Sequence, residues 1–488
     1  MNLGDWNALV TDLTPRLAGL RVRVYGSGGA PYHHLALATL LGANAAPISA
    51  DQIRSGGLEE ADVFVMPGGG VRAMSGLLVP LGVEGAAAIR RWVDGGGMYV
   101  GSCAGSFLPA AVGESFWDAN PQARAMCMVN AQLHNREDSE WAGLTSPGVG
   151  TVHVTTERPR HWLARGLPPH FRLVHYNGPM FSARPGEPPR PEQVAGAALE
   201  DVTGVVRFAE ATRDFTPGEA MMAATVDGAT LFESGAAAGA FSAVVGPFAR
   251  GTVVLFGSHP EFGLDTVQLG WDDGVRLFGN ALARQAASAT RGPSASAAAP
   301  DGAGTDTDAV RAALANAATL ARANADAFRA LAQRDPGAWV SPGSVGRFLG
   351  LEPRALWRHA ALDAAAASSA TAAYLEEVTP SDPPPAAAGP WLHALAPEDQ
   401  DYGFVGLLPL LDRVRTMAHE AERAVDGSPF GLQGPYDAMD RHPYQLAMSS
   451  YLSAAGLAAS ALLSAVTLGR LLGDTTQLPS RRLLADLH

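Results

Sequence analysis

The arrangement of short apolar runs in residues 20–263 constrains the fold of this chain more than any other feature of its sequence. These runs alternate with stretches of helical spacing, which is the pattern of a β-sheet covered by helices on both faces. Most of the runs are continuously apolar, as expected for parallel strands that are buried on both sides. We therefore expect an α/β domain with strands at residues 21–25, 62–66, 98–101, 172–176, 204–208 and 252–257, and helices at 31–41 and 85–93.

A chain of 488 residues is too long for one ordinary hydrophobic core, so we expect a second domain. Residues 287–305 are nearly all small, bury too little apolar surface to fold, and are interpreted as a linker. Beyond them the sequence has helical periodicity, with one stripe formed by Val310, Leu314, Phe328 and Leu331. The predicted organisation is an α/β domain at 1–286, the linker, and an all-α helical domain at 306–488, in which the Pro-rich stretch 382–390 separates two halves.

Charge and amino-acid usage narrow the classes of partner. The formal net charge is -13 and no basic run occurs, which argues against nucleic acid, because phosphates are neutralised by basic surfaces. All 35 residues in the Lys+Arg count are arginine, so the chain contains no lysine. GC-rich codon usage is one explanation. The other is that a lysine-free chain escapes a lysine-directed modification system, and the sequence leaves both open.

Cysteine usage and hydropathy predict a location. The chain has two cysteines, which is too few for a disulfide framework, and its first ten residues lack the features of a signal peptide. We therefore expect the reducing cytoplasm. Residues 446–469 carry no charge but are rich in Ala and Ser, which is more typical of the buried helix of a bundle than of a bilayer span. We expect no association with a membrane.

The segment Gly101-Ser102-Cys103-Ala104-Gly105 ends one of the predicted strands and precedes a helical stretch. Small residues on both sides of a central nucleophile are typical of the nucleophile elbow, a tight turn that lifts the side chain out of the sheet. The turn also places Cys103 at a helix N-terminus, where backbone N–H groups favour a thiolate. This pattern predicts a nucleophilic Cys103, and the alternative is a small buried cysteine without chemistry.

A second apolar run leads directly into His259-Pro260-Glu261. Proline holds the residue before it extended, and residues two apart in an extended segment project to the same side. His259 is then placed to exchange protons with the thiol, while Glu261 orients the imidazole. The alternative is a turn histidine followed by a solvated glutamate.

A third run opens into Pro67-Gly68-Gly69-Gly70. Successive glycines let backbone N–H groups point inward, so Gly69 together with the N–H of Ala104 is predicted to stabilise a tetrahedral oxyanion. An ordinary turn between a strand and a helix is the alternative.

Other polar residues follow predicted strands, at the edge where open α/β sheets bind ligands. We expect Tyr32 and Asn177, which follow such strands, to bind substrate together with Gly68 and Gly70 of the glycine run. Weaker candidates for the same pocket are His33, His34, Asn130 and His134. Although His33 and His34 are adjacent, no further His or Cys falls near them at ligand spacing, so we expect no metal. Cys127 is predicted to be buried and inert.

Taken together, the motifs resemble those of the class I glutamine amidotransferase-like superfamily, whose members use a Cys-His-Glu triad. The nearest likeness is to the N-terminal domain of eukaryotic biotin-protein ligases and to the free-standing bacterial proteins similar to it. It covers residues 21–283 and rests on three segments, Val22-Arg23-Val24-Tyr25 before Gly-Ser-Gly-Gly, Tyr99 to Gly105, and Tyr176-Asn177-Gly178-Pro179. The resemblance implies a flavodoxin-like sheet, an oxyanion loop around Gly69, and a catalytic trio of Cys103, His259 and Glu261.

Two functional hypotheses follow. The favoured one is a cysteine-dependent amide hydrolase or amidotransferase-like enzyme, which forms an acyl-thioester on a glutamine-like, peptide or conjugate amide and needs no cofactor. The chain has no biotin-ligase motif and no synthetase domain, so transfer of ammonia is not implied. The alternative is a non-catalytic ligand-binding or scaffold protein that uses the same pocket, engages a protein partner through the helical domain, and has a link to lysine-directed modification.

Overall fold

The computed structural model describes residues 3–69, 73–134, 147–182, 199–217, 228–262, 273–288, 306–334, 353–395, 403–425 and 443–474. The backbone divides into two compact units, one formed by Met1–Gly292 with Gln400–Gly403 and the other by Pro293–Asp399 with Phe404–His488. The division falls inside the predicted linker, of which residues 289–305 lie outside the described ranges. Helix α10 (Gly274–Ser288) continues two residues past the predicted start of that linker.

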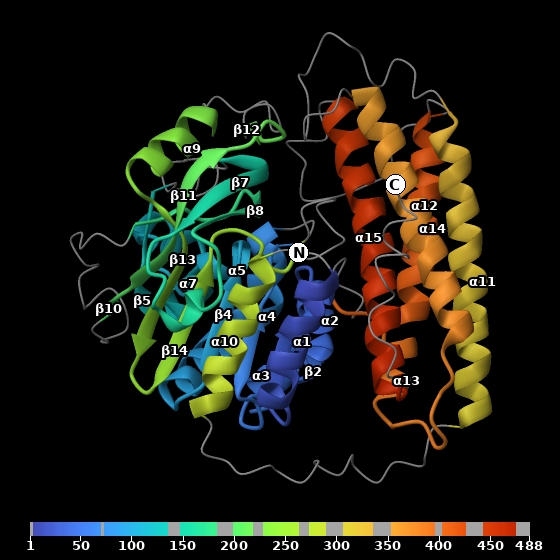
Figure 1. Cartoon of the computed structure of the whole chain (residues 1–488), viewed down its shortest axis with the longest axis horizontal. Coiled ribbons are helices and arrows are strands. Elements are labelled where there is room, and N and C mark those ends of the chain that lie inside the picture. The colour runs from blue at the N-terminus through green and yellow to red at the C-terminus, as the bar shows by residue number, and fades with distance from the viewer. Residues whose placement is uncertain are drawn as a thin grey trace. The chain divides into compact units, whose positions relative to one another are not determined.

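The first unit is built on a mixed sheet (Figure 1). Its parallel half has the strand order β2-β1-β3-β4-β14. The bounds are β1 (Arg21–Tyr25), β2 (Asn44–Ile48), β3 (Val63–Met66), β4 (Met98–Ser102) and β14 (Gly251–Phe256). Counted along these five strands, the order is 2-1-3-4-5, which is that of flavodoxin-like doubly wound folds. The parallel half therefore has the fold that the sequence predicts.

The other half of the sheet is antiparallel, contrary to the sequence-based expectation for two strands. Strand β13 (Phe241–Phe248) pairs with β14, and β11 (Thr203–Ala211), β7 (Gly148–Thr156) and β8 (His170–Tyr176) follow outward. The strands predicted at 172–176 and 204–208 thus belong to β8 and β11 and are not parallel. The start of β8 alternates between exposed and buried residues, which is typical of antiparallel strands with one solvated face.

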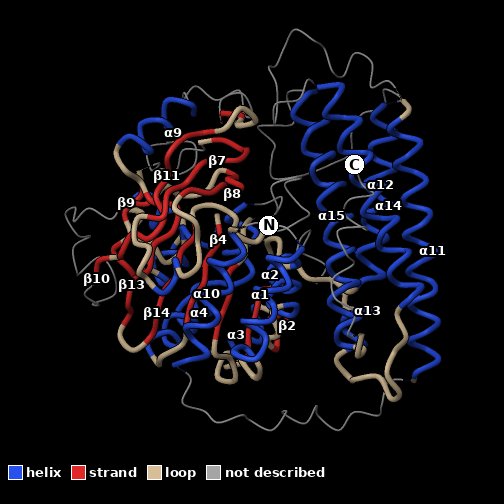
Figure 2. Tube along the Cα trace, viewed as in Figure 1, coloured by secondary structure: helices blue, strands red, loops and turns tan. Residues whose placement is uncertain are grey.

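Shorter strands complete the sheets among the described residues (Figure 2). They are β5 (Val129–Asn130), β6 (Gln132–Leu133), β9 (Phe181–Ser182), β10 (Glu200–Asp201) and β12 (Thr216–Pro217). Strands β5 and β10 pair only with each other, whereas β6, β9 and β12 join the main sheet.

Helices cover both faces of the parallel strands. Phe64 and Met66 of β3 lie in one hydrophobic core with Leu77 and Ile89 of α4 (Ala73–Asp94), and α3 (Ala50–Arg54) and α7 (Pro121–Met126) add to it. The alternate residue Val65 points to the opposite face and is also buried. Helices α1 (Leu3–Leu17), α2 (Tyr32–Leu40) and α10 pack together as a second group. The remaining short elements are α5 (Ala104–Phe107), α6 (Glu114–Ala119), η1 (Trp162–Ala164) and α9 (Gly228–Ala237).

The described part of the second unit is helical. Helices α11 (Thr307–Ala332), α12 (Pro353–Glu377), α15 (Pro443–Leu471) and α14 (Leu407–Val425) contact one another in that cyclic order, which makes a four-helix bundle. All four residues of the predicted stripe on α11 are buried. The Pro-rich stretch 382–390 lies between α12 and α13 (Ala388–His393), and its last residues begin α13.

One helix in the described part of the chain is long and apolar enough to cross a membrane, over Ala454–Leu471. Of that window, 78% is buried inside the protein. Because α15 packs against α12 and α14, the apolar residues are covered by neighbouring helices, as in the core helix of a bundle.

Candidate active site

The candidate site lies at one edge of the parallel half-sheet. Strands β3, β4 and β14 are parallel neighbours, so their carboxyl ends meet at the same edge. Gly68, Cys103 and His259 each follow one of these ends within three residues. Segments that are far apart in the sequence are thereby brought together, as their predicted positions after the strands require.

Cys103 occupies a strained turn between β4 and α5. Its backbone has φ 49 and ψ -117, a conformation that residues other than glycine rarely adopt. A Cβ on Gly101 would lie 2.7 Å from the carbonyl oxygen of Gly105, which explains the small residues on both sides. The Cys103 N–H donates to the Phe256 carbonyl at 2.9 Å, which ties the turn to the end of β14. The local geometry is that of a nucleophile elbow.

His259 and Glu261 form a buried pair, although by a different backbone path from the predicted extended one. The His259 N–H donates to the Val174 carbonyl at 2.8 Å, and the Phe262 N–H donates back to the His259 carbonyl at 3.3 Å, so Pro260 and Glu261 lie in a turn. Even so, Nδ1 of His259 is 2.8 Å from Oε1 of Glu261. The Phe262 ring stacks on the imidazole with centroids 4.3 Å apart, which fixes the plane of the imidazole.

The electrostatics of the pair favour the charged form of both groups. Burial by itself would lower the pKa of His259, but the charges of Glu261 and Cys103 outweigh it and raise that pKa to about 10. Burial would likewise raise the pKa of Glu261, yet the neighbouring His34 and His259 lower it to about 2. An imidazolium paired with a carboxylate is the form that stabilises a nearby thiolate.

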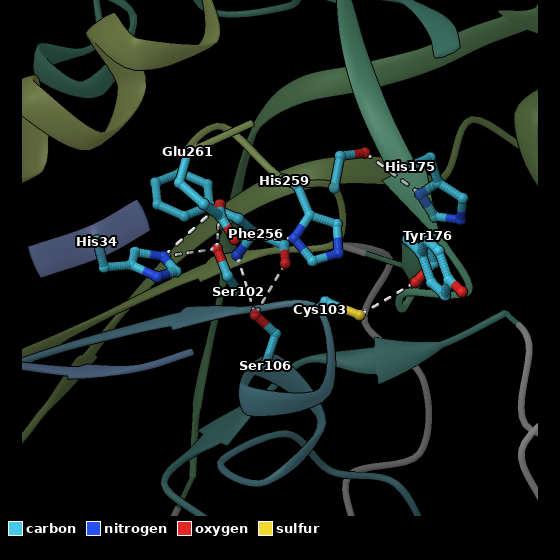
Figure 3. A network of polar contacts seen from close by, with 10 residues as sticks. His34, Ser102, Cys103, Ser106, His175, Tyr176, Phe256, His259 and Glu261 are labelled. Atoms are coloured by element: carbon cyan, nitrogen blue, oxygen red, sulfur yellow. Dashed lines mark hydrogen bonds and ion pairs between the residues drawn. The ribbon is translucent and has the colours of Figure 1, made fainter. Parts of the chain in front are cut away.

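The thiol and the imidazole flank Gly68. A Cβ on Gly68 would lie 2.8 Å from Cε1 of His259 and 3.5 Å from Cβ of Cys103, so both side chains approach this glycine. The Cys103 thiol donates to the carbonyl oxygen of Tyr176 at 3.1 Å, and Nε2 of His259 is buried without a hydrogen-bond partner among the described residues (Figure 3). The thiol lies close enough to the imidazole for its charge to raise the pKa of His259. Catalytic hydrogen bonds often tighten only when substrate binds.

The predicted oxyanion loop is partly described. Gly68 and Gly69 follow β3 beside the elbow, and Ala104 is the first residue of α5, where a backbone N–H has no acceptor within the helix. The Gly68 carbonyl is used by the Ala30 N–H at 3.1 Å, which holds the loop against the segment after β1. Gly70 lies outside the described residues.

The two remaining substrate-binding candidates have different surroundings. The Tyr32 hydroxyl donates to the Gly403 carbonyl at 3.3 Å, so this group is engaged by the protein. Asn177 directly follows Tyr176, has a positive φ of 49, and donates its N–H to the Gly148 carbonyl at 2.8 Å. Its Oδ1 is buried and accepts no hydrogen bond from the described residues.

The weaker sequence candidates separate into two groups. His33 contacts the edge of Phe262, whose ring stacks on His259, so it lies behind the imidazole. Asn130 instead donates to Asp201 at 2.7 Å between β5 and β10, and His134 contacts Ser234 of α9 at 3.0 Å. Those two residues therefore bond to partners outside the trio. Cys127 is fully buried, and burial raises its pKa to about 12.

Sequence reasoning missed two buried histidine–serine contacts. Nε2 of His34 lies 3.3 Å from Oγ of Ser102, and Nδ1 of His175 lies 3.3 Å from Oγ of Ser258 (Figure 3). The two serines immediately precede Cys103 and His259 in the sequence. The serine directly before Cys103 and the serine directly before His259 were the available signal in the sequence. The histidine that contacts each serine could not be predicted from the sequence.

No protein-family model and no curated protein sequence matches the chain. Among the solved structures that resemble it, three illustrate the low scores. A chain of PurLQS from Thermotoga maritima is 14% identical with a TM-score of 0.34, and the match covers 54% of this chain and 97% of that one. The glutaminase domain of Trypanosoma brucei CTPS with bound acivicin is 13% identical with a TM-score of 0.32, and the match covers 55% of this chain and 94% of that one.

The third is a cytoplasmic protein from Salmonella typhimurium, which is 13% identical with a TM-score of 0.32 over 54% of this chain and 98% of that one. All three matches cover about half of this chain. The strand order 2-1-3-4-5, rather than these scores, identifies the parallel half-sheet as flavodoxin-like.

Proposed function

We propose that this chain is a cysteine-dependent amide hydrolase or amidotransferase-like enzyme that reacts through an acyl-thioester at Cys103. One observation carries the proposal. Cys103 sits in a strained elbow at the carboxyl end of β4, and the buried His259–Glu261 pair follows the adjacent strand β14. A nucleophile, a base and a group that orients the base are the parts that nucleophilic catalysis of acyl transfer needs.

The chemistry follows from the charges of these groups. His259 holds the proton that the thiol loses, and Glu261 stabilises the resulting imidazolium. The thiolate attacks the amide carbonyl carbon, and the imidazolium gives its proton to the leaving nitrogen as the C–N bond breaks. Water then attacks the thioester while His259 takes one of its protons, which releases the carboxylic acid and restores the thiol. An amine in place of water would give transfer instead of hydrolysis.

Two further roles are proposed for the surrounding backbone. The N–H groups of Gly69 and Ala104 are proposed to donate to the oxyanion that forms on the carbonyl. The free Oδ1 acceptor of Asn177 would bind an N–H group of the substrate. Gly68 is proposed to shape the pocket, because any side chain there would collide with His259. The substrate class is a glutamine-like side chain, a small peptide or a conjugate amide.

The motifs around Tyr25, Cys103 and Asn177 resemble those of the biotin-protein ligase N-terminal domain. This resemblance supports a relationship between the first unit and that family. The site residues of the resemblance coincide with Cys103, His259 and Glu261, and the flavodoxin-like strand order agrees with it. We propose this relationship for the first unit only, and the bundle of the second unit is proposed to engage a protein partner.

Turnover of simple amides tests the function. The full chain and a Cys103→Ala variant would be incubated with L-glutamine, asparagine, and peptide and aryl amides, and released ammonia or amine would be measured. The proposal expects release by the wild-type chain that falls by about 1000-fold or more in the variant, because the covalent step is lost. Equal release by both proteins would contradict it. Binding of an amide without any turnover would favour the non-catalytic alternative.

A further inference from the structure

Both oxygens of the Glu261 carboxylate are engaged, and they are engaged by different parts of the fold. Oε1 lies 2.8 Å from Nδ1 of His259. Oε2 accepts from the Ser102 hydroxyl at 2.9 Å and lies 3.6 Å from Nε2 of His34 (Figure 3). The Glu261 side chain is almost completely buried, so these donors stand in for the water that a carboxylate otherwise requires.

The donors on Oε2 come from two separate elements. Ser102 is the last residue of β4, and its side chain points away from the Cys103 thiol toward Glu261 (Figure 3). His34 lies in α2 and is fully buried, with its ring against the Phe278 ring of α10 at a centroid distance of 5.4 Å. Their positions are therefore set by the sheet and by the packing of α2 on α10.

The direction of the Ser102 hydroxyl depends on His34. A hydroxyl has one hydrogen to donate, and Nε2 of His34 is 3.3 Å from the oxygen that carries it. When the His34 N–H donates to that oxygen, the Ser102 hydrogen is free to point to Glu261. Nδ1 of His34 is buried without a partner among the described residues, which fits a neutral ring with its proton on Nε2. Burial lowers the pKa of His34, so the neutral form holds at neutral pH.

We propose that His34, acting through Ser102, is a positioning residue that holds the Glu261 carboxylate in line with His259, an inference that rests on the function proposed for Cys103. Without His34 the Ser102 hydroxyl can turn to another acceptor, and Oε2 of Glu261 then loses the donor that Ser102 supplies. A buried carboxylate with fewer donors takes up a proton more readily. The positive charge on His259 would then be stabilised less well by Glu261. As a result, His259 would stabilise the Cys103 thiolate less well.

Other titratable groups also face this network. Among the described residues they are His33 from α2, His175 and Tyr176 from β8, and Cys103 from the elbow. Burial lowers the pKa of His175 to about 3, so it is neutral over the working range. Tyr176 has a pKa raised to about 12 by burial and by Cys103, so its phenol is neutral as well. His175 and Tyr176 therefore contribute no change of charge over the working range.

The test uses the rate at which iodoacetamide alkylates Cys103 in the full chain, measured by mass spectrometry between pH 5 and 10. This readout needs no substrate. We expect His34→Leu and Ser102→Ala to slow alkylation about tenfold at pH 6.5 and to shift the profile to higher pH, since Ser102→Ala removes a donor to the carboxylate and His34→Leu removes the group that orients this donor. His34→Gln keeps an N–H donor near the position of Nε2 and is expected to restore most of the rate.

His175→Gln is the matched control, because His175 is another buried histidine beside a serine, but the hydroxyl of that serine, Ser258, accepts from Ser242. It is expected to lower thermal stability without moving the alkylation profile. A purely structural role for His34 predicts that His34→Leu and His175→Gln behave alike, and that result would overturn the inference.

A double-mutant cycle keeps the inference falsifiable if His34→Leu folds poorly. In a Glu261→Gln background, Ser102→Ala is expected to have no further effect on alkylation, because its target has lost its charge. Additive effects would overturn the inference. If alkylation behaves as expected but no amide is turned over, the positioning role stands and the proposed function fails.

Discussion

Glu261 sets the charge of His259, because it is the only carboxylate shown to contact this imidazole among the described residues. Replacing it by glutamine removes a charge and leaves a group of similar size. The pKa of His259 then falls from about 10, since burial is no longer outweighed by the carboxylate. We predict a loss of amide turnover of about 100-fold or more, the scale of general acid–base catalysis. Turnover measured from pH 5 to 10 checks this, and a variant with wild-type rates would contradict it.

The same pair predicts how stability depends on pH. The pKa of Glu261 is lowered from 4.5 to about 2, so its contribution is present above about pH 4.5 and is lost as pH falls toward 2. The pKa of His259 is raised from 6.5 to about 10, so its contribution is present below pH 6.5 and is lost as pH rises through 10.

The pair is therefore expected to stabilise the first unit most between about pH 4.5 and 6.5. Thermal unfolding of wild type and His259→Gln, compared over pH 3 to 10, measures this. The difference in melting temperature between the two proteins should be largest in that window. A difference that does not change with pH would show that the pair contributes no linked protonation.

At the scale of elements, the loop after β3 must pass close to the imidazole. In Gly68→Ala the new Cβ would lie 2.8 Å from Cε1 of His259, so the loop or the ring must shift. We predict that turnover falls roughly 10- to 100-fold while the protein remains folded, because small displacements of reacting groups have effects of this size.

Gly389→Ala is the matched control for that change. A Cβ there meets no atom within 4 Å, and Gly389 lies in α13 of the other unit. Alanine in a helix is expected to preserve or slightly raise stability and to leave turnover unchanged. If Gly68→Ala were as active as this control, close contact between the loop and His259 would not matter for catalysis.

The elements that the sequence predicts are those with a strong local signal. Strands β3, β4 and β14 are mainly apolar runs and β1 alternates arginine with valine, and the structure places each within two residues of the predicted bounds. Strand β2 (Asn44–Ile48) was missed because it contains Pro47 and lies at the edge of the sheet. Helix α1 was not predicted, although Leu9 and Leu13 have helical spacing and are buried, because Pro15 near its end is unfavourable for a helix.

The candidate site is predictable to a similar degree and for the same reason. Cys103 and His259 each carry a local motif, and parallel neighbouring strands bring the two motifs together. The contact of His34 with Ser102 depends on how α2 packs on the sheet, which leaves no pattern in the sequence. The antiparallel half was misread because long-range pairing, not composition, decides strand direction.

At the scale of the whole molecule, every contact that the proposed mechanism uses lies within Met1–Gly292. We therefore predict that a chain ending at Gly292 folds and keeps the reactivity of Cys103. It loses the hydrogen bond from Tyr32 to Gly403, which is expected to lower its stability by about 1 kcal/mol. Circular dichroism and the alkylation rate, compared with the full chain, measure both properties. Aggregation of the shorter chain would show that the two units depend on each other.

The central claim is that Cys103 is an activated nucleophile, and competitive alkylation of the two cysteines tests it most directly. The native full chain would be treated with limiting iodoacetamide at pH 6.5, and the labelled peptides would be quantified by mass spectrometry. Cys127 is buried, with its pKa raised to about 12, so it serves as the internal control. We predict that the label is found almost entirely on Cys103 and that His259→Gln slows its attachment. Equal labelling of both cysteines, or labelling of Cys103 that is indifferent to His259, would contradict the account.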